Sequence, residues 1–167
     1  MAEIARVSQV LVGQIYRDFA RKEDLIAAIV ERDVTQILDD PDIAGSIATG
    51  NVDQLNNWVR RFMGERLEQE ARNILADILA EAGRNPRIAA IVSAAHKRFH
   101  DRVASAAALW VPAPEKEAAR HEIAELILAT AGAIRHRQLF GLESDALITK
   151  KMLDVVYDEI ARLGPTA

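Results

Sequence analysis

A short segment near the N-terminus carries side chains of the kinds that contact nucleic acid. Gln14 can form two hydrogen bonds with an adenine edge, and Val12 can contact a thymine methyl group. Tyr16 and Arg17 suit phosphate oxygens, as does Lys22, which lies at the expected start of a helix where free backbone amides also favour an anion. Val12, Gly13, Gln14, Tyr16, Arg17 and Lys22 are therefore candidates for a DNA-contacting surface, and the alternative is that the polar side chains among them are only solvated.

Short helices are needed to hold these side chains in place. Helical periodicity predicts helices over residues 2–8 and 12–19 and a longer connecting helix over 22–38. Two short helices joined by a tight turn are typical of a helix-turn-helix, whose second helix enters the major groove of DNA. The core of this unit is predicted to contain Ile4, Ile15, Phe19 and Leu25.

The order of residue types in this segment resembles that of the TetR family of one-component transcriptional regulators. The matching positions, in register without a gap, are Ile4, Ala5, Val10, Gly13, Ile15, Tyr16, Phe19, Lys22, Glu23, Asp24 and Leu25. The resemblance implies an all-α fold, with a helix-turn-helix DNA-binding unit followed by a helical effector-binding and dimerisation domain. It also implies the function of a repressor that a small hydrophobic effector releases from operator DNA.

The segment departs from the family pattern in several places. Leu11 and Arg21 stand where the family has helix-capping residues, and the loss of each cap costs about 1 kcal/mol. Val7-Ser8-Gln9 replaces the family's usual small turn. Met1 falls at the start of the family's second helix, so the first helix is expected to be absent from this chain. Losing that packing partner should cost the DNA-binding unit several kcal/mol.

The rest of the chain also has helical periodicity, and no segment alternates like a strand. A loop is predicted after residue 38, marked by Asp39-Asp40-Pro41, Gly45 and Gly50. The domain boundary is placed in this loop, giving a partial DNA-binding domain with its connecting helix over residues 1–40 and a helical domain over 41–167. Further helices are predicted over 52–70, 71–82, 86–110, 115–139 and 145–163, and Asn85-Pro86 is expected to open the third of them.

Composition limits the classes of protein that the sequence allows. The 167 residues contain no cysteine, which excludes disulfides, zinc–thiolate sites and thiol catalysis. The N-terminus lacks a signal-peptide pattern, and the most apolar stretch, Leu126 to Ile134, is too short to span a bilayer, so we expect a cytoplasmic location and no membrane partner. The net charge of −4 means that any DNA contact must come from a local surface.

The helical domain carries apolar and polar side chains at helical spacings on three helices that are expected to face one another. One interpretation is a packed core, and the other is a cavity for an effector, lined by some of these residues. The aromatic and methionine side chains suggest a hydrophobic or aromatic small molecule. The candidate pocket residues are Trp58, Phe62, Met63, Arg66, Ile78, His96, Phe99, His100 and Val103.

His96 and His100 form an i, i+4 pair, which is a spacing used by metal ligands. The sequence places no third ligand, and Lys97 and Arg98 would repel a cation, so no metal site and no cofactor are predicted. His121 and His136 are expected to be isolated surface residues.

The last two predicted helices carry apolar stripes that are expected to form both intramolecular and intermolecular contacts. One stripe must serve the chain's own core, and a second would be exposed in a monomer. In the TetR family these helices pair with a second copy as a four-helix bundle, which implies a homodimer suited to a palindromic operator. The predicted dimer-interface residues are Ile123, Ile127, Ala131, Ile134, Met152, Val156 and Ile160.

The sequence gives little support to catalysis. It has no Glu-x-x-His pair of the di-iron type, no Gly-rich phosphate loop after a strand, and no serine or threonine with a placed base, so the chain is not expected to be an enzyme. The alternative to a DNA-binding regulator is a helical dimeric module that binds a ligand or another protein but no longer binds DNA. DNA binding separates the two.

Overall fold

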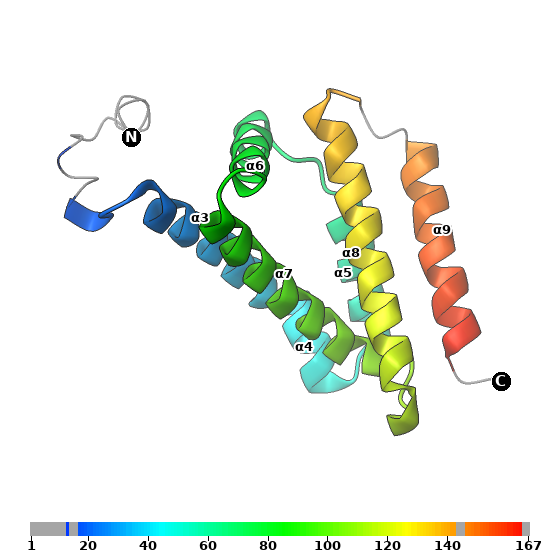
Figure 1. Cartoon of the computed structure of the whole chain (residues 1–167). Coiled ribbons are helices and arrows are strands. Elements are labelled where there is room, and N and C mark those ends of the chain that lie inside the picture. Colours follow the sequence, from blue (N-terminus) through cyan, green and yellow to red (C-terminus); the bar gives the residue numbers. More distant parts are fainter. Residues whose placement is uncertain (1–12, 14–16, 143–145, 165–167) are drawn as a thin grey trace.

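A computed structural model describes residues 13, 17–142 and 146–164 of the chain (Figure 1). These residues form helices and no strand, which confirms the predicted all-α fold class. None of the helices in this part of the chain is long and apolar enough to cross a membrane. The helices are α3 (Lys22–Leu38), α4 (Pro41–Thr49), α5 (Val52–Gly64), α6 (Gln69–Ala82), α7 (Pro86–Ala106), α8 (Glu117–Leu139) and α9 (Ala146–Leu163), with short 3-10 turns η1 (Ala107–Leu109) and η2 (Pro114–Lys116) between α7 and α8.

The predicted loop after residue 38 is mostly the helix α4, which corrects the sequence-based expectation. The Asp40 carboxylate accepts a hydrogen bond from the Asp42 amide (2.9 Å), so it caps the helix just ahead of Pro41. Gly50 ends α4 with φ of 70°, in the left-handed region that glycine favours. Gly45 lies inside α4, where an added Cβ would come 2.7 Å from the Gln54 side chain of α5. Gly50 therefore ends a helix and Gly45 allows that helix to pack closely on α5, so neither glycine marks a loop.

Local capping signals fix the starts of several helices. The Asn85 side chain accepts a hydrogen bond from the Arg87 amide (3.0 Å) ahead of Pro86, which confirms the predicted start of α7. At the start of α3, where Arg21 replaces a capping residue, the Asp24 carboxylate accepts from the Arg21 amide (3.1 Å). This bond satisfies the backbone N–H of Arg21 at the N-cap of α3.

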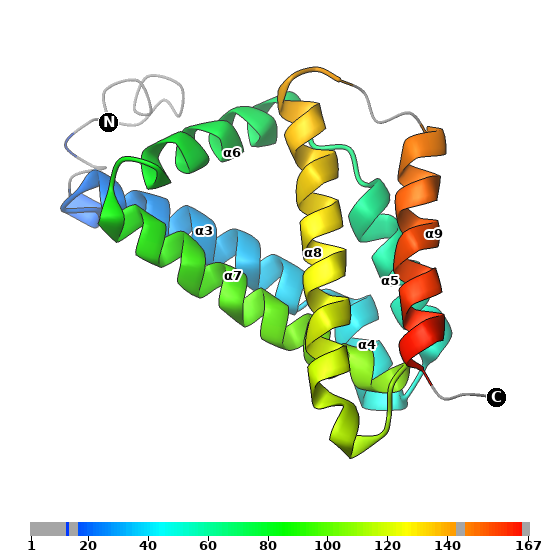
Figure 2. The ribbon, with the colours of Figure 1, turned by 45° about the vertical axis from the view of Figure 1, so that its right-hand side comes forward.

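The helices form two packed groups that share α7. Helix α3 runs alongside α7, and α6 leaves this pair and crosses to the C-terminal end of α8 (Figure 2). Helices α5, α8 and α9 pack together on the other side of the molecule. Gln138 of α8 is 6% exposed and joins the α5–α6 connection, accepting from the Leu67 amide (3.0 Å) and donating to the Glu65 carbonyl (3.1 Å).

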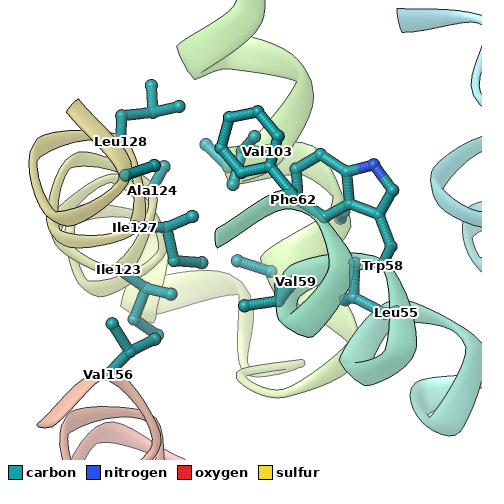
Figure 3. Packing of buried hydrophobic residues seen from close by; sticks show 14 of the residues in the cluster. Leu55, Trp58, Val59, Phe62, Val103, Ile123, Ala124, Ile127, Leu128 and Val156 are labelled. Carbon is teal, nitrogen blue, oxygen red and sulfur yellow. The ribbon is translucent and has the colours of Figure 1, made fainter. Parts of the chain in front are cut away.

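The larger core lies between α4, α5, α7, α8 and α9 (Figure 3). Its centre is aromatic: Trp58 stacks on Phe62 with ring centroids 5.0 Å apart, and Phe99 meets both rings edge-on at 6.2 and 5.2 Å. Such pairs add about 0.5–1.5 kcal/mol each beyond the burial of their area. A smaller second cluster contains Ile26, Ile78 and Ile88 and joins α3, α6 and α7. The described residues therefore form two apolar clusters, a larger and a smaller one.

Two valines of α5 provide a matched test of the larger core. Val59 is 0% exposed, whereas Val52 on the same helix is 37% exposed. Val59→Ala should lower the free energy of unfolding by about 2 kcal/mol, since it removes two buried methyl groups and leaves a cavity. Val52→Ala should change it by no more than about 0.5 kcal/mol. Urea unfolding followed by circular dichroism measures both, and equal losses would contradict this description of the core.

Candidate functional site

The predicted DNA-contacting residues fall mainly at the edge of the described structure. Val12, Gln14 and Tyr16 lie outside the described residues, while Gly13 and Arg17 are exposed. Lys22 is also exposed, and its Nζ forms an ion pair with Glu81 Oε2 of α6 at 3.0 Å. Contact of these residues with DNA stays a prediction, and the structure adds an intramolecular partner with which a phosphate would compete for Lys22.

The start of α3 is tied to the α6–α7 junction by a series of polar contacts. Lys22 pairs with Glu81, and the side-chain amide of Asn85 donates to the Glu23 carboxylate (2.8 Å). The Arg87 guanidinium donates to the Asp24 carboxylate (3.1 Å). These contacts join residues about 60 positions apart, so helical periodicity along the sequence carries no signal for them.

Two further contacts follow along α3. Glu31 pairs with Arg98 of α7 at 2.6 Å, and the Leu38 carbonyl accepts from Arg102 at 3.4 Å. Together with the contacts at its start, they make a polar seam that follows α3 from its first turn to its last residue.

Three carboxylates of this seam, those of Glu81, Glu31 and Glu23, have a lowered pKa. Hydrogen bonds from Lys22 and then Arg84 lower the pKa of Glu81, and the hydrogen bond from Arg98 lowers the pKa of Glu31. The pKa of Glu23 is lowered by a backbone hydrogen bond and then by Asn85. All three carboxylates are accessible to solvent, so each contact is individually weak and the set defines the register of α3.

A cavity of about 680 Å³ lies between α3, α5, α6 and α8. This volume falls within the range of roughly 300–1,000 Å³ typical of small-molecule sites. The lining contains apolar and charged side chains, and α3, α5 and α6 each supply both kinds. The apolar residues are Ile37, Trp58, Phe62, Ile74, Leu75 and Ile78, and the charged residues are Arg32, Asp33, Asp40, Arg61, Glu65, Glu68, Glu70 and Arg135.

Three of the predicted pocket residues, Trp58, Phe62 and Ile78, line this cavity. The other six do not line it. Met63, Phe99 and Val103 are buried in the larger core, which supports the packed-core interpretation for these three. Arg66 and His96 are exposed, and His100 is partly buried between α7 and α8.

Three arginines of the cavity lining, Arg32, Arg61 and Arg135, are not among the residues predicted from the sequence. Arg61 is neutralised by ion pairs with Asp40 (2.7 Å) and Asp42. Arg135 of α8 lies over the Phe62 ring, 4.2 Å from its centroid, and donates to the Phe62 carbonyl (3.2 Å). Burial lowers the pKa of Arg135, and the charge of Glu65 acts in the opposite direction. In the sequence, Arg135 marks only the end of an apolar stretch, so its position on the cavity wall depends on the tertiary packing.

The predicted dimer-interface residues lie inside the single chain, which is a correction. Six of the seven are 8% exposed or less, namely Ile123, Ile127, Ala131, Ile134, Val156 and Ile160, and Met152 packs against the same core. A second copy could not contact side chains already buried in this way. The large apolar side chains exposed at this end of the molecule are Phe140, Leu142, Leu147 and Val155, at 67, 51, 55 and 57%.

No protein-family model, curated protein or solved structure matches this chain. The resemblance to the TetR family is therefore supported by residues 4–25 alone, and an inference about function depends on the chemistry and geometry of the chain itself.

The ion pair at the start of α3 gives a pH-dependent prediction. Glu81→Gln should destabilise the protein at neutral pH, because Lys22 and Arg84 lose a charged partner. The pKa of Glu81 is lowered from 4.5 in the folded protein, so its stabilisation is complete above that value and is lost as the pH falls through the lowered pKa. The difference in stability from wild type should therefore disappear once the pH falls below the lowered pKa of Glu81.

Urea unfolding at neutral and acidic pH tests this expectation. Glu70→Gln, an exposed position on the same helix, is the control and should have little effect at either pH. Unchanged stability of Glu81→Gln at neutral pH would show that the seam contributes nothing measurable.

Proposed function

We propose that this chain is a one-component DNA-binding transcriptional regulator, of the kind that its N-terminal segment resembles. In this proposal it is a repressor whose cavity takes a small hydrophobic effector and which then leaves its operator. The proposal joins two parts of the chain, the predicted recognition segment over residues 12–19 and the cavity of the helical domain.

The observation that carries the proposal is the position of α3. This helix begins three residues after the predicted recognition segment, and its later residues Arg32, Asp33, Gln36 and Ile37 line the cavity. A ligand that displaces this wall acts on the same rigid element that carries the N-terminal segment. A single helix thereby gives a physical route from effector to DNA contact.

Helix α6 also lines the cavity and contacts α3. Helix α6 supplies Ile74, Leu75 and Ile78, and Ile78 also belongs to the apolar cluster that holds α3. An effector seated between α6 and α3 would compete with this contact and would move α3, and with it the segment that precedes α3.

The alternative function, a helical module that binds a ligand or another protein without DNA, also has an observation in its favour. Lys22 is already paired with Glu81, and Arg21 provides no side-chain cap to α3. Under this alternative the N-terminal segment would only cover the end of α3. Measurements with DNA separate the two functions.

The DNA-binding prediction is tested with a duplex from the region upstream of the encoding gene. Binding should exceed that of a scrambled duplex, and Arg17→Ala and Lys22→Ala should each weaken it on all sequences. Each substitution should reduce the slope of log affinity against log salt by about one, as expected for one lost phosphate contact. Fluorescence anisotropy at several salt concentrations measures both quantities.

Lys97→Ala, at an exposed position of α7 away from the N-terminal segment and from α9, is the matched control and should leave DNA affinity unchanged. The same measurement is made on a form of the chain that carries an upstream extension. If neither form prefers the specific duplex, the regulator proposal is wrong and the alternative module is favoured.

A homodimer is the second expectation of the proposal, because a palindromic operator needs two recognition helices. We place the interface on the outward faces of α8 and α9, where Val155 is exposed and the small residues Ala129, Gly132 and Ala133 would allow close approach. Light scattering should give twice the chain mass of 18.4 kDa. Val155→Glu should give a monomer, because it places a charge in an apolar contact.

Leu79→Glu is the matched control for this variant. Leu79 is 47% exposed but lies on α6, away from the proposed interface, so this substitution should leave the dimer intact. A wild-type chain that is monomeric at micromolar concentration would refute the dimer.

A further inference from the structure

Two histidines and three carboxylates meet between α7 and α8. His100 and Asp101 are consecutive residues of α7, and His121 lies on α8 with Glu117 and Glu125 one turn to either side. The rings of His100 and His121 stack with centroids 5.2 Å apart and an interplanar angle of 19°. We call these five residues the α7–α8 histidine cluster.

The possible ligand atoms of the cluster are close together. One atom each from His100, Asp101 and His121 can be chosen so that all three lie within 4.8 Å of one another. Glu125 Oε2 is 4.0 Å from His100 Nε2, and Glu117 Oε1 is 3.9 Å from His121 Nε2. Among the described residues, the cluster therefore has the composition of a two-histidine, carboxylate metal site.

Only small side-chain movements separate this arrangement from coordination. Ligand atoms about 2.0–2.2 Å from a tetrahedral metal lie roughly 3.3 Å apart, so the cluster must contract by about 1–1.5 Å. The side chain of His100 is 19% exposed and fixed by packing, whereas those of Asp101 and His121 are 48% and 44% exposed. The two outer ligands have room to rotate towards the inner one.

The neighbouring cations do not oppose a metal here, although the sequence suggested that they would. Lys97 binds Oδ2 of Asp101 at 2.7 Å, while Oδ1 of the same carboxylate faces His100 Nδ1 at 3.6 Å. Arg98 pairs with Glu31 of α3. Both cations thus already have carboxylate partners, and one oxygen of Asp101 remains available.

We propose that the α7–α8 histidine cluster binds one divalent transition-metal ion, with His100, His121 and Asp101 as protein ligands and a fourth position open to water. Imidazole together with carboxylate favours Zn²⁺, Ni²⁺ or Co²⁺ over Mg²⁺ and Ca²⁺, which prefer oxygen ligands alone. The site lies apart from the cavity and does not depend on the proposed regulatory function.

A metal in this position would cross-link α7 to α8. Helix α7 packs along α3, and α8 carries part of the proposed dimer face. An ion that binds only the folded chain raises its stability by mass action. The site would therefore stabilise the contact between the two helices that connect the α3 side of the molecule with the α9 side.

The proposal is tested on the full chain with cobalt chloride and zinc chloride. Titration calorimetry should give one Co²⁺ per chain, with visible d–d absorption and a rise in melting temperature. The double variant His100→Ala, His121→Ala should bind at least about 100-fold more weakly, since loss of an outer-shell partner alone costs 10–100-fold. His121→Ala alone provides a variant at a half-exposed position that should fold normally and still lose the absorption.

The matched control is the double variant His96→Ala, His136→Ala. These exposed histidines lie on the same two helices, with His96 one turn before His100, and their removal should leave the affinity and spectrum unchanged. The proposal is overturned if the wild-type chain binds no Co²⁺. It is equally overturned if His121→Ala keeps the full absorption, or if the control variant loses as much affinity as the cluster variant.

Discussion

The attachment of α3 to α6 and α7 is the constraint on which the rest of the structure depends. Ile26, Ile78 and Ile88 supply its apolar contact, and each is less than a tenth exposed. Fully burying such side chains contributes about 1.5–3 kcal/mol each, whereas solvent-exposed ion pairs contribute about 0–1 kcal/mol. The isoleucines therefore provide most of the energy, and the polar contacts from Lys22 to Arg102 align the helices along their length.

Helix α7 contributes side chains to both apolar clusters and so connects them. The larger cluster fixes α4, α5, α8 and α9 around the aromatic centre, and the smaller one holds α3 and α6. The cavity lies where these two groups meet, with Trp58 and Phe62 on the larger side and Ile78 on the smaller. A ligand there touches both groups, and a metal between α7 and α8 would brace the connection between them.

The sequence predicts those parts of the fold that depend on local chemistry. The helical class and the start of α7 at Asn85-Pro86 follow from periodicity and capping, and the structure confirms both. Sequence alone predicts a loop in place of α4 because Gly45 resembles a helix breaker, whereas its role is to let the Gln54 side chain approach. That role is visible only once α5 is packed against α4.

The parts that could not be predicted depend on which elements become neighbours. The apolar periodicity of α8 and α9 shows that one face is buried but not whether the chain itself or a second copy covers it, so the prediction for Ile127 and Val156 names the wrong contact. His100 and His121 are separated by 21 positions and two short turns, and only the packing of α7 on α8 brings their rings together. The position of Arg135 over Phe62 is a tertiary feature of the same kind.

The proposed function requires that the segment preceding α3 recognises a DNA sequence. In vitro selection from random-sequence duplexes tests it most directly, because the operator sequence need not be specified in advance. If the proposal is correct, the selection should enrich duplexes that share a palindromic site. Its half-sites should lie about one helical turn of DNA apart, as two recognition helices on one dimer require. Recovery of duplexes with no common sequence would contradict the claim.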